Sequence, residues 1–159
     1  MQSRPSLNAA VIIERQQNPS KWEEWRFLVA DVVVDEGQFG DSPRVLRDDG
    51  RVALTVYPGL PVTLFKDEGE GYYLNLTSGR PVWFVMWRTD ENDKSRAWPE
   101  IVTVSYNEAG RFLDAQERVD NVPLPADVCG WLQEFTDANY KPEPKKRRRP
   151  ASFIAPDKR

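Results

Sequence analysis

The chain has 159 residues, of which 40% are hydrophobic and 30% charged, and a formal net charge of −3. These values are ordinary for one soluble domain. There is no histidine and only one cysteine, Cys129. The composition therefore excludes an internal disulfide, a thiolate metal cage and acid–base catalysis by imidazole. No apolar run reaches the length of a membrane span, and the first residues lack the apolar core of a secretion signal, so we expect a cytoplasmic protein.

The charge is divided by position along the chain. Residues 141–159 hold eight Lys/Arg and two Asp/Glu, a net charge of +6. The other 140 residues hold 14 Lys/Arg and 23 Asp/Glu, a net charge of −9. This division predicts one globular domain over residues 1–140, followed by a flexible, Pro-containing basic tail over residues 141–159.

The first half of the chain has the patterns of strands. Short β-branched or alternating runs predict strands over residues 9–15, 22–34, 51–57, 61–66 and 72–77. Residues 35–50 are rich in Gly and Asp and predict a long loop. Residues 67–71 predict a hairpin connection. We interpret its carboxylates as exposed, because ionised carboxylates are rarely buried without a partner.

Two further strands follow in the second half. Residues 82–88 (VWFVMWR) are apolar on both faces, which predicts a central strand covered on both sides. Residues 100–105 predict one more strand, and residues 119–123 a connector.

Two helices are predicted after the strands. Ser105 and Glu108 match a capping box, which predicts a helix from this point to about Gln116. Pro125 fits the first turn of a second helix that ends near Tyr140. The residues expected to face inward are Ala109, Phe112 and Leu113 on the first helix, and Val128, Trp131, Leu132 and Phe135 on the second.

Strands followed by helices indicate the α+β class. We expect a curled antiparallel sheet or small open barrel of about six to seven strands, followed by two C-terminal helices and the basic tail. The chain shows no βαβ alternation and no Gly-rich phosphate-binding loop.

The basic tail contains an unbroken cationic run between two prolines. Such runs repel themselves, stay extended and often serve as interaction arms. Two apolar residues follow and would anchor in a groove on a partner. The predicted partner-binding residues are Lys145, Lys146, Arg147, Arg148, Arg149, Phe153 and Ile154. An acidic protein surface and a nucleic acid both fit this chemistry. The alternatives are a solvated tail that only aids solubility and a tail that folds back onto the acidic body.

Three stretches of the chain resemble one known family. They are residues 67–85 (DEGEGYYLNLTSGRPVWFV), 102–114 (VTVSYNEAGRFLD) and 122–149, and the strongest elements are EGYYLNL and the Tyr-x-Pro-Glu-Pro step that starts at Tyr140. Together they resemble a proteobacterial domain family of unknown function whose genes lie near those of molybdenum-dependent formate dehydrogenases. The motif positions, with no known role, are Glu70, Gly71, Tyr72, Tyr73 and Asn75.

The resemblance implies a non-catalytic accessory protein. Its partner would be formate dehydrogenase or a maturation factor of that enzyme. Some members of the family are named as molybdopterin guanine-dinucleotide synthesis enzymes, but the absence of a Gly-rich nucleotide loop argues against that activity here. A histidine expected shortly before Tyr140 is absent. We assign no catalytic residue, cofactor or metal, and keep two alternatives. One is nucleic-acid binding by the tail. The other is a histidine-independent enzyme linked to molybdopterin cofactor synthesis, for which Tyr72, Tyr73 and nearby carboxylates are the cluster to test.

Overall fold

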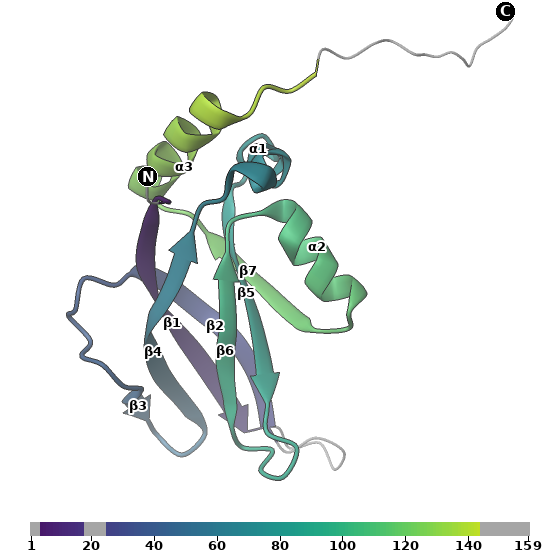
Figure 1. Ribbon diagram of the computed structural model, residues 1–159. Coiled ribbons are helices and arrows are strands. Elements are labelled where there is room, and N and C mark those ends of the chain that lie inside the picture. Colours follow the sequence, from purple (N-terminus) through teal and green to yellow (C-terminus); the bar gives the residue numbers. More distant parts are fainter. Residues whose placement is uncertain (1–3, 18–24, 144–159) are drawn as a thin grey trace, which may run out of the picture.

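The computed structural model describes residues 4–17 and 25–143 (Figure 1), and within these ranges it has seven strands in two antiparallel sheets and three α-helices. The first sheet has the order β2–β1–β4–β3 and is built from β1 (Ser6–Gln17), β2 (Trp25–Val34), β3 (Arg44–Asp48) and β4 (Val52–Thr63). The second sheet has the order β6–β5–β7 and is built from β5 (Val82–Thr89), β6 (Ala97–Thr103) and β7 (Arg118–Pro123). The helices are α1 (Gly69–Leu76), α2 (Tyr106–Asp114) and α3 (Ala126–Asn139), with a short 3₁₀ turn at Lys66–Glu68. The α+β class is confirmed, and the two sheets stay open in the described part of the chain.

The hydrophobic core lies between the sheets and continues under the helices. Its fully buried members include Val11 of β1, Trp83 of β5 and Leu132 of α3. Phe27 of β2 meets Trp87 of β5 edge to face, with 6.1 Å between ring centroids. One core thus joins both sheets and α3.

Two hydrogen bonds tie the sheets together at their margins. The Asp120 carboxylate on β7 accepts from the Val29 backbone N–H on β2 at 2.9 Å. On the other side, the Tyr57 hydroxyl of β4 donates to the Ala97 carbonyl oxygen of β6 at 2.7 Å. β2 lies at the edge of its sheet, so Asp120 caps an N–H group that the β-ladder leaves open.

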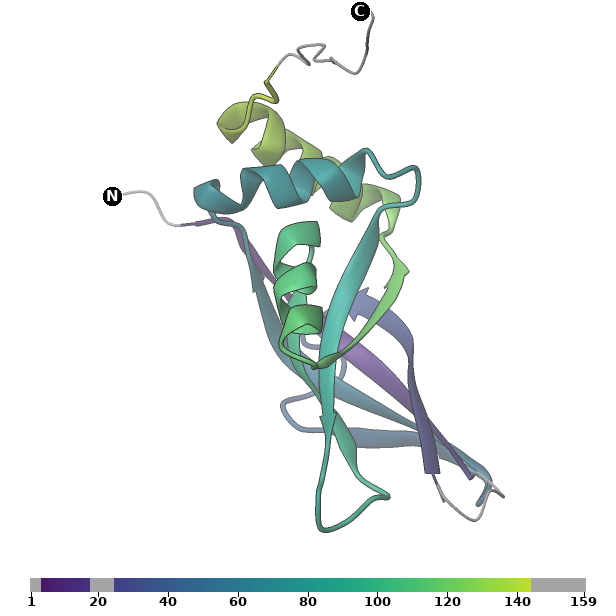
Figure 2. The ribbon, with the colours of Figure 1, turned by 90° about the vertical axis from the view of Figure 1, so that its right-hand side faces the viewer.

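The helices gather at one end of the molecule (Figures 1 and 2). The chain leaves α3 at that same end. None of the helices in the described ranges combines the length and apolar character that a membrane crossing requires.

The predicted strand at residues 72–77 is wrong, because this segment forms α1. The predicted hairpin at residues 67–71 is also wrong, since it forms the 3₁₀ turn and the start of the helix. The Tyr-Leu-Leu alternation suggested a period of two. Packing instead buries Gly69, Gly71, Tyr72 and Asn75, whose spacings of three and four residues are those of one helical face. Burial of one helical face against α3 and the second sheet overrides the local strand preference.

Three other expectations need correction. The loop expected over residues 35–50 contains β3, whose five residues are all exposed, so no apolar pattern marked it. The strands expected at 51–57 and 61–66 join into one long strand, β4, which bulges where Gly59 adopts a φ of 77°. Residues 64–66 lie beyond its end, and Lys66 begins the 3₁₀ turn. The connector expected at 119–123 forms β7, and its pairing with β5 gives that strand a neighbour on each side.

The central strand and both later helices are confirmed. β5 lies in the middle of its sheet, and only Arg88 of its eight residues is exposed. The Ser105 side chain caps α2 by accepting from the Glu108 N–H at 3.0 Å. The apolar stripe of α3 packs into the core as expected. Leu113 does not face inward, since 57% of it is exposed at the end of α2.

Candidate functional site

The five motif positions all lie in α1, and each makes a specific contact. Tyr72 is 2% exposed, and its hydroxyl accepts from the Phe65 backbone N–H at 2.9 Å. Its ring meets Phe135 of α3 at 5.9 Å between centroids. Burial raises the pKa of Tyr72 to about 12. Tyr72 therefore joins the 3₁₀ turn to α3, and its hydroxyl stays protonated at neutral pH.

Asn75 is a buried polar link between α1 and the second sheet. Only 1% of it is exposed. Its amide nitrogen donates to the carbonyl oxygens of Val82 and Val104, each at 2.9 Å. Its carbonyl oxygen accepts from the Val82 N–H at 3.0 Å. Since these backbone groups lie at the start of β5 and the end of β6, a satisfied amide fixes where α1 sits on the sheet.

Gly71 allows α1 to approach the N-terminus of α2 closely. A Cβ at this position would overlap the Ser105 hydroxyl. That hydroxyl caps α2 and also donates to the Glu68 carboxylate at 2.5 Å. Beside it, the Glu70 carboxylate accepts from the Asn107 side-chain amide at 2.9 Å. Two motif positions thus serve the junction between α1 and α2.

The carboxylates predicted to lie in an exposed hairpin are partly engaged in this junction. Glu68 keeps only 17% side-chain exposure, and its second oxygen pairs with the Arg111 guanidinium at 2.7 Å. The hydrogen bond to Glu68 raises the pKa of Arg111 above its ordinary value. Asp67 and Glu70 are exposed, as expected. The two glycines of this segment, Gly69 and Gly71, are buried instead of exposed.

Tyr140 connects the motif to the point where the basic segment begins. Gly69 lies so near Tyr140 that a Cβ on the glycine would be 2.7 Å from the Tyr140 Cβ. The rings of Tyr73 and Tyr140 are 5.5 Å apart between centroids. The Tyr140 backbone N–H also donates to the Thr136 carbonyl oxygen at 2.8 Å. The two strongest motif elements of the sequence therefore meet in space.

The seven predicted tail residues lie outside the described residues. They are Lys145, Lys146, Arg147, Arg148, Arg149, Phe153 and Ile154. The described chain continues to Glu143, three residues beyond Tyr140, at the helical end of the molecule. The assignment of the seven residues to partner binding stays a prediction.

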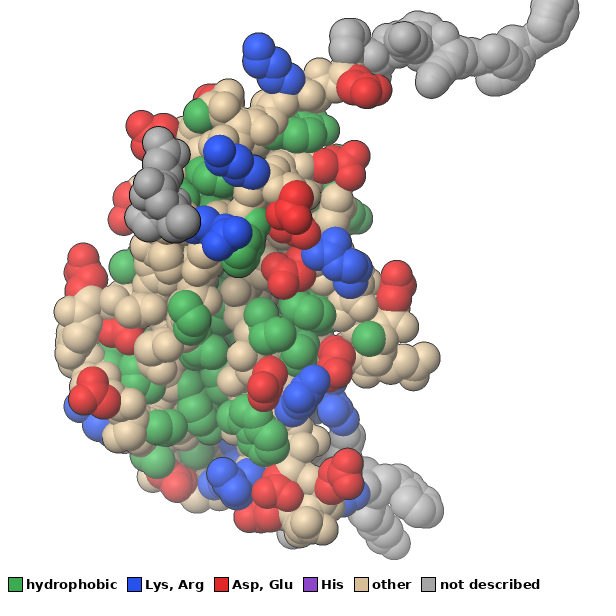
Figure 3. Space-filling model, in the orientation of Figure 1, with side chains coloured by type: hydrophobic (Ala, Val, Ile, Leu, Met, Phe, Trp, Pro, Cys, Tyr) green, Lys and Arg blue, Asp and Glu red, His purple; other side chains and the backbone are tan. Residues whose placement is uncertain are grey.

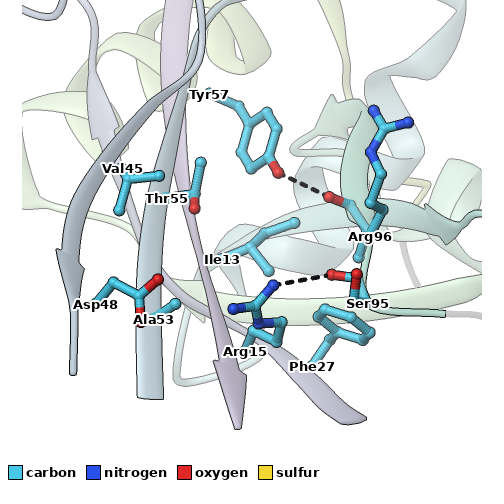
Figure 4. A pocket seen from close by; sticks show the side chains of 11 residues that line it. Ile13, Arg15, Phe27, Val45, Asp48, Ala53, Thr55, Tyr57, Ser95 and Arg96 are labelled. Atoms are coloured by element: carbon cyan, nitrogen blue, oxygen red, sulfur yellow. Dashed lines mark hydrogen bonds between the residues drawn. The ribbon is translucent and has the colours of Figure 1, made fainter. Parts of the chain in front are cut away.

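A pocket that the sequence did not indicate lies toward the other end of the sheets. It has a volume of about 190 Å³ and is lined by side chains of β1, β2, β3, β4 and the segment that leads into β6 (Figure 4). Arg15 and Asp48 are among its lining residues. No sequence motif marks it, since its walls come from five separate segments.

Within the described ranges, no three Cys, Asp or Glu side chains lie close enough together to hold a metal ion. Cys129 is partly buried next to the apolar stripe of α3. Burial, followed by the charge of Asp127, raises the pKa of its thiol. A raised pKa keeps the sulfur in its less nucleophilic thiol form.

Residues 8–149 match the model of a family described as a protein of unknown function (DUF3305). The chain belongs to this family. No curated protein and no solved structure matches the chain. Because the match extends from β1 to the cationic run, DUF3305 includes both the globular body and the predicted partner-binding cations. The motif positions on α1 gain structural roles in this family member: they join α1 to α2, α3 and the second sheet.

Proposed function

We propose that this DUF3305 protein is a non-catalytic accessory protein that binds an acidic partner through the basic segment at residues 141–159. The observation that carries the proposal is the charge division, with +6 on this segment and −9 on the rest of the chain. Arginine-rich segments recognise carboxylates through charge-assisted and often bidentate hydrogen bonds. The basic segment therefore attracts an acidic partner, whereas the negatively charged body of the protein does not.

The charges on the body support this assignment. Figure 3 shows acidic and basic side chains scattered over one face of the described residues, with hydrophobic side chains collected in a central band. Several arginines of the body are already paired, as Arg88 is with Glu117 at 2.9 Å. Dispersed and paired cations give a weak field, whereas five consecutive cations at 145–149 give a concentrated one.

The anchoring of Tyr140 also supports the proposal. Contacts with Gly69 and Tyr73 fix the end of α3, three residues before the last described residue. A fixed end of α3 defines where the chain leaves the folded body and the basic segment begins. The partner would then contact both the segment and the exposed side chains at this end, such as Leu74.

The resemblance to proteins encoded beside formate dehydrogenase genes supplies the class of partner. We propose a molybdenum-dependent formate dehydrogenase or one of its maturation factors. Binding would then assist assembly or maturation of that enzyme and would need no catalytic group on this chain.

The test is affinity purification from the native host with three forms of the protein. They are the full-length chain, a chain that ends at Glu143, and a full-length variant in which Lys145–Arg149 are all Gln. The full-length chain should retain formate dehydrogenase or a maturation factor. Both altered forms should recover about tenfold less partner or even less, since about 1.4 kcal/mol of lost binding free energy lowers affinity tenfold. Their unfolding midpoints should match that of the full-length chain.

A control variant removes cations of the body instead. Arg44, Arg47 and Arg51 are exposed on and beside β3, and changing all three to Gln should leave recovery of the partner unchanged. Equal recovery by all forms overturns the proposal. Recovery of nucleic acid in place of a protein, lost in the same two altered forms, supports the nucleic-acid alternative instead.

A further inference from the structure

The pocket between the sheets has opposite charges on its two sides. In the pairing of the strands, Arg15 of β1 lies opposite Ala53 of β4, and Ala53 lies opposite Asp48 of β3. The three residues therefore form one row across the sheet, and all three line the pocket (Figure 4). Because neighbouring strands are about 4.8 Å apart, the backbones of Arg15 and Asp48 are separated by roughly 10 Å. The small Ala53 side chain leaves the space between them open.

Arg15 is a partly buried cation with incomplete pairing. One guanidinium nitrogen, Nη1, donates to the Ser95 carbonyl oxygen at 3.3 Å, and the group lies 4.4 Å from the centroid of the Trp25 ring. Its Nε is buried and has no hydrogen-bond partner. Among the described residues, no carboxylate lies within ion-pair distance of Arg15. A partly desolvated guanidinium held by neutral groups favours an anion beside it.

Asp48 places a negative charge on the opposite side of the pocket. One of its oxygens accepts from the Gly50 backbone N–H at 2.9 Å, and the structure gives no bond to the other. A carboxylate here repels a ligand that is negative at both ends and favours one with a donor or a positive group. Ala53 forms the floor between the two charges. The neighbouring row of the sheet, Ile13, Thr55 and Val45, adds two apolar side chains and one hydroxyl to the lining.

We propose that this pocket binds a small amino acid whose carboxylate lies beside Arg15 and whose ammonium group lies toward Asp48, with a short aliphatic chain between them. The volume of about 190 Å³ is below the range of drug-sized ligand sites and suits a molecule of this size. The separation of the charges favours an amino group several bonds from the carboxylate. The test of this site is independent of partner binding.

The test is a titration of the full-length protein with 4-aminobutanoate, followed by backbone amide NMR. Glycine and 6-aminohexanoate serve as shorter and longer probes, and butanoate and butylamine each carry one of the two charges. We expect saturable shifts at Ala53 and Thr55 with 4-aminobutanoate, and weaker binding of both single-charge probes. Arg15→Gln should weaken binding of 4-aminobutanoate about tenfold or more. Arg26→Gln, which removes an exposed cation of the neighbouring strand β2, should leave the affinity unchanged.

Two further variants keep the test decisive if Arg15→Gln fails to fold. Asp48→Asn should reduce the preference for 4-aminobutanoate over butanoate, because the group facing the ammonium loses its charge. Ala53→Val should block the binding of 4-aminobutanoate and of butanoate, because the larger side chain fills the floor of the pocket without any change of charge. Absence of saturable shifts with all three amino acids overturns the proposal. The proposal is also overturned if Arg15→Gln and Asp48→Asn bind 4-aminobutanoate as tightly as the wild type does, or if Ala53→Val does so.

Discussion

Gly69 and Tyr140, 71 positions apart in the sequence, are in direct contact, and a Cβ on Gly69 would lie 2.7 Å from the Tyr140 Cβ. The contact holds the end of α3 against the start of α1. It also joins two of the three stretches on which the resemblance of the sequence rests, residues 67–85 and 122–149. The basic segment therefore begins at a position that the fold determines.

Replacing Gly69 with alanine should move Tyr140 and destabilise the protein. The Tyr140 Cβ belongs to the rigid part of its side chain, so relief requires a shift of the α3 end. We expect a loss of about 1–3 kcal/mol in the free energy of unfolding, measured in urea. Gly110→Ala in α2 is the matched control, because a Cβ there meets nothing within 4 Å. It should keep the stability or raise it by up to about 1 kcal/mol. Equal effects of the two substitutions would contradict the close contact.

Replacing Asn75 with alanine should be among the most damaging changes at the motif. It leaves the Val82 N–H and the carbonyl oxygens of Val82 and Val104 without their partner in a buried site. We expect a loss of about 3 kcal/mol or more in the free energy of unfolding, since each unsatisfied buried group costs about 1–3 kcal/mol. Asn107→Ala removes a solvent-exposed hydrogen bond to Glu70, and should change stability by less than about 0.5 kcal/mol.

The Tyr72 hydroxyl should make stability depend on pH in the alkaline range. Its folded-state pKa is raised from 10.0 to about 12, chiefly by burial. The folded state therefore releases this proton at higher pH than the unfolded state. The contribution to stability is complete below pH 10 and falls as the pH rises toward 12.

Tyr72→Phe isolates this contribution. At neutral pH the variant should lose about 1 kcal/mol, because the Phe65 N–H loses its acceptor. Between pH 10 and 12 the wild type should lose up to about 2–3 kcal/mol more than the variant. Chemical unfolding at a series of pH values measures the difference. A constant gap between the two proteins across this range would show that Tyr72 titrates normally.

The hydrogen bond from Val29 to Asp120 should matter for the joining of the two sheets. Asp120→Ala leaves the N–H of Val29, a residue only 7% exposed, without an acceptor, and we expect a loss of about 1–3 kcal/mol. Asp120→Asn retains a carbonyl oxygen in the same place and should lose less. Amide hydrogen exchange at Val29 gives the direct readout, with faster exchange in Asp120→Ala than in Asp120→Asn. Unchanged protection in both variants would mean that the bond contributes nothing.

The sequence predicted the elements whose burial follows a simple period. The run at residues 82–88 is apolar on both faces, and β5 is covered on both faces. The Ser105 cap and the stripe of α3 follow from local chemistry. α1 was missed because Tyr72, Leu74 and Leu76 alternate, whereas the fold buries residues three and four positions apart, two of which are glycines. β3 was missed because all its residues are exposed.

The contacts between distant segments had no signal in the sequence. Gly69 gave no indication that it makes room for Tyr140, and Gly71 none that it makes room for Ser105. The row of Arg15, Ala53 and Asp48 depends on the register of three strands. Such registers are set by packing of the whole core and by bulges, which composition and periodicity do not specify.

The most direct test of the proposed function is the dissociation constant of the purified complex with formate dehydrogenase or its maturation factor, measured as a function of salt. For the full-length protein we expect tight binding that weakens steeply as salt rises, since the contacts at Lys145–Arg149 are charge pairs exposed to screening. The variant with five Gln at these positions should bind about tenfold or more weakly at low salt, with little dependence on salt. Equal dissociation constants for the two proteins across the whole salt range would contradict the role of the basic segment.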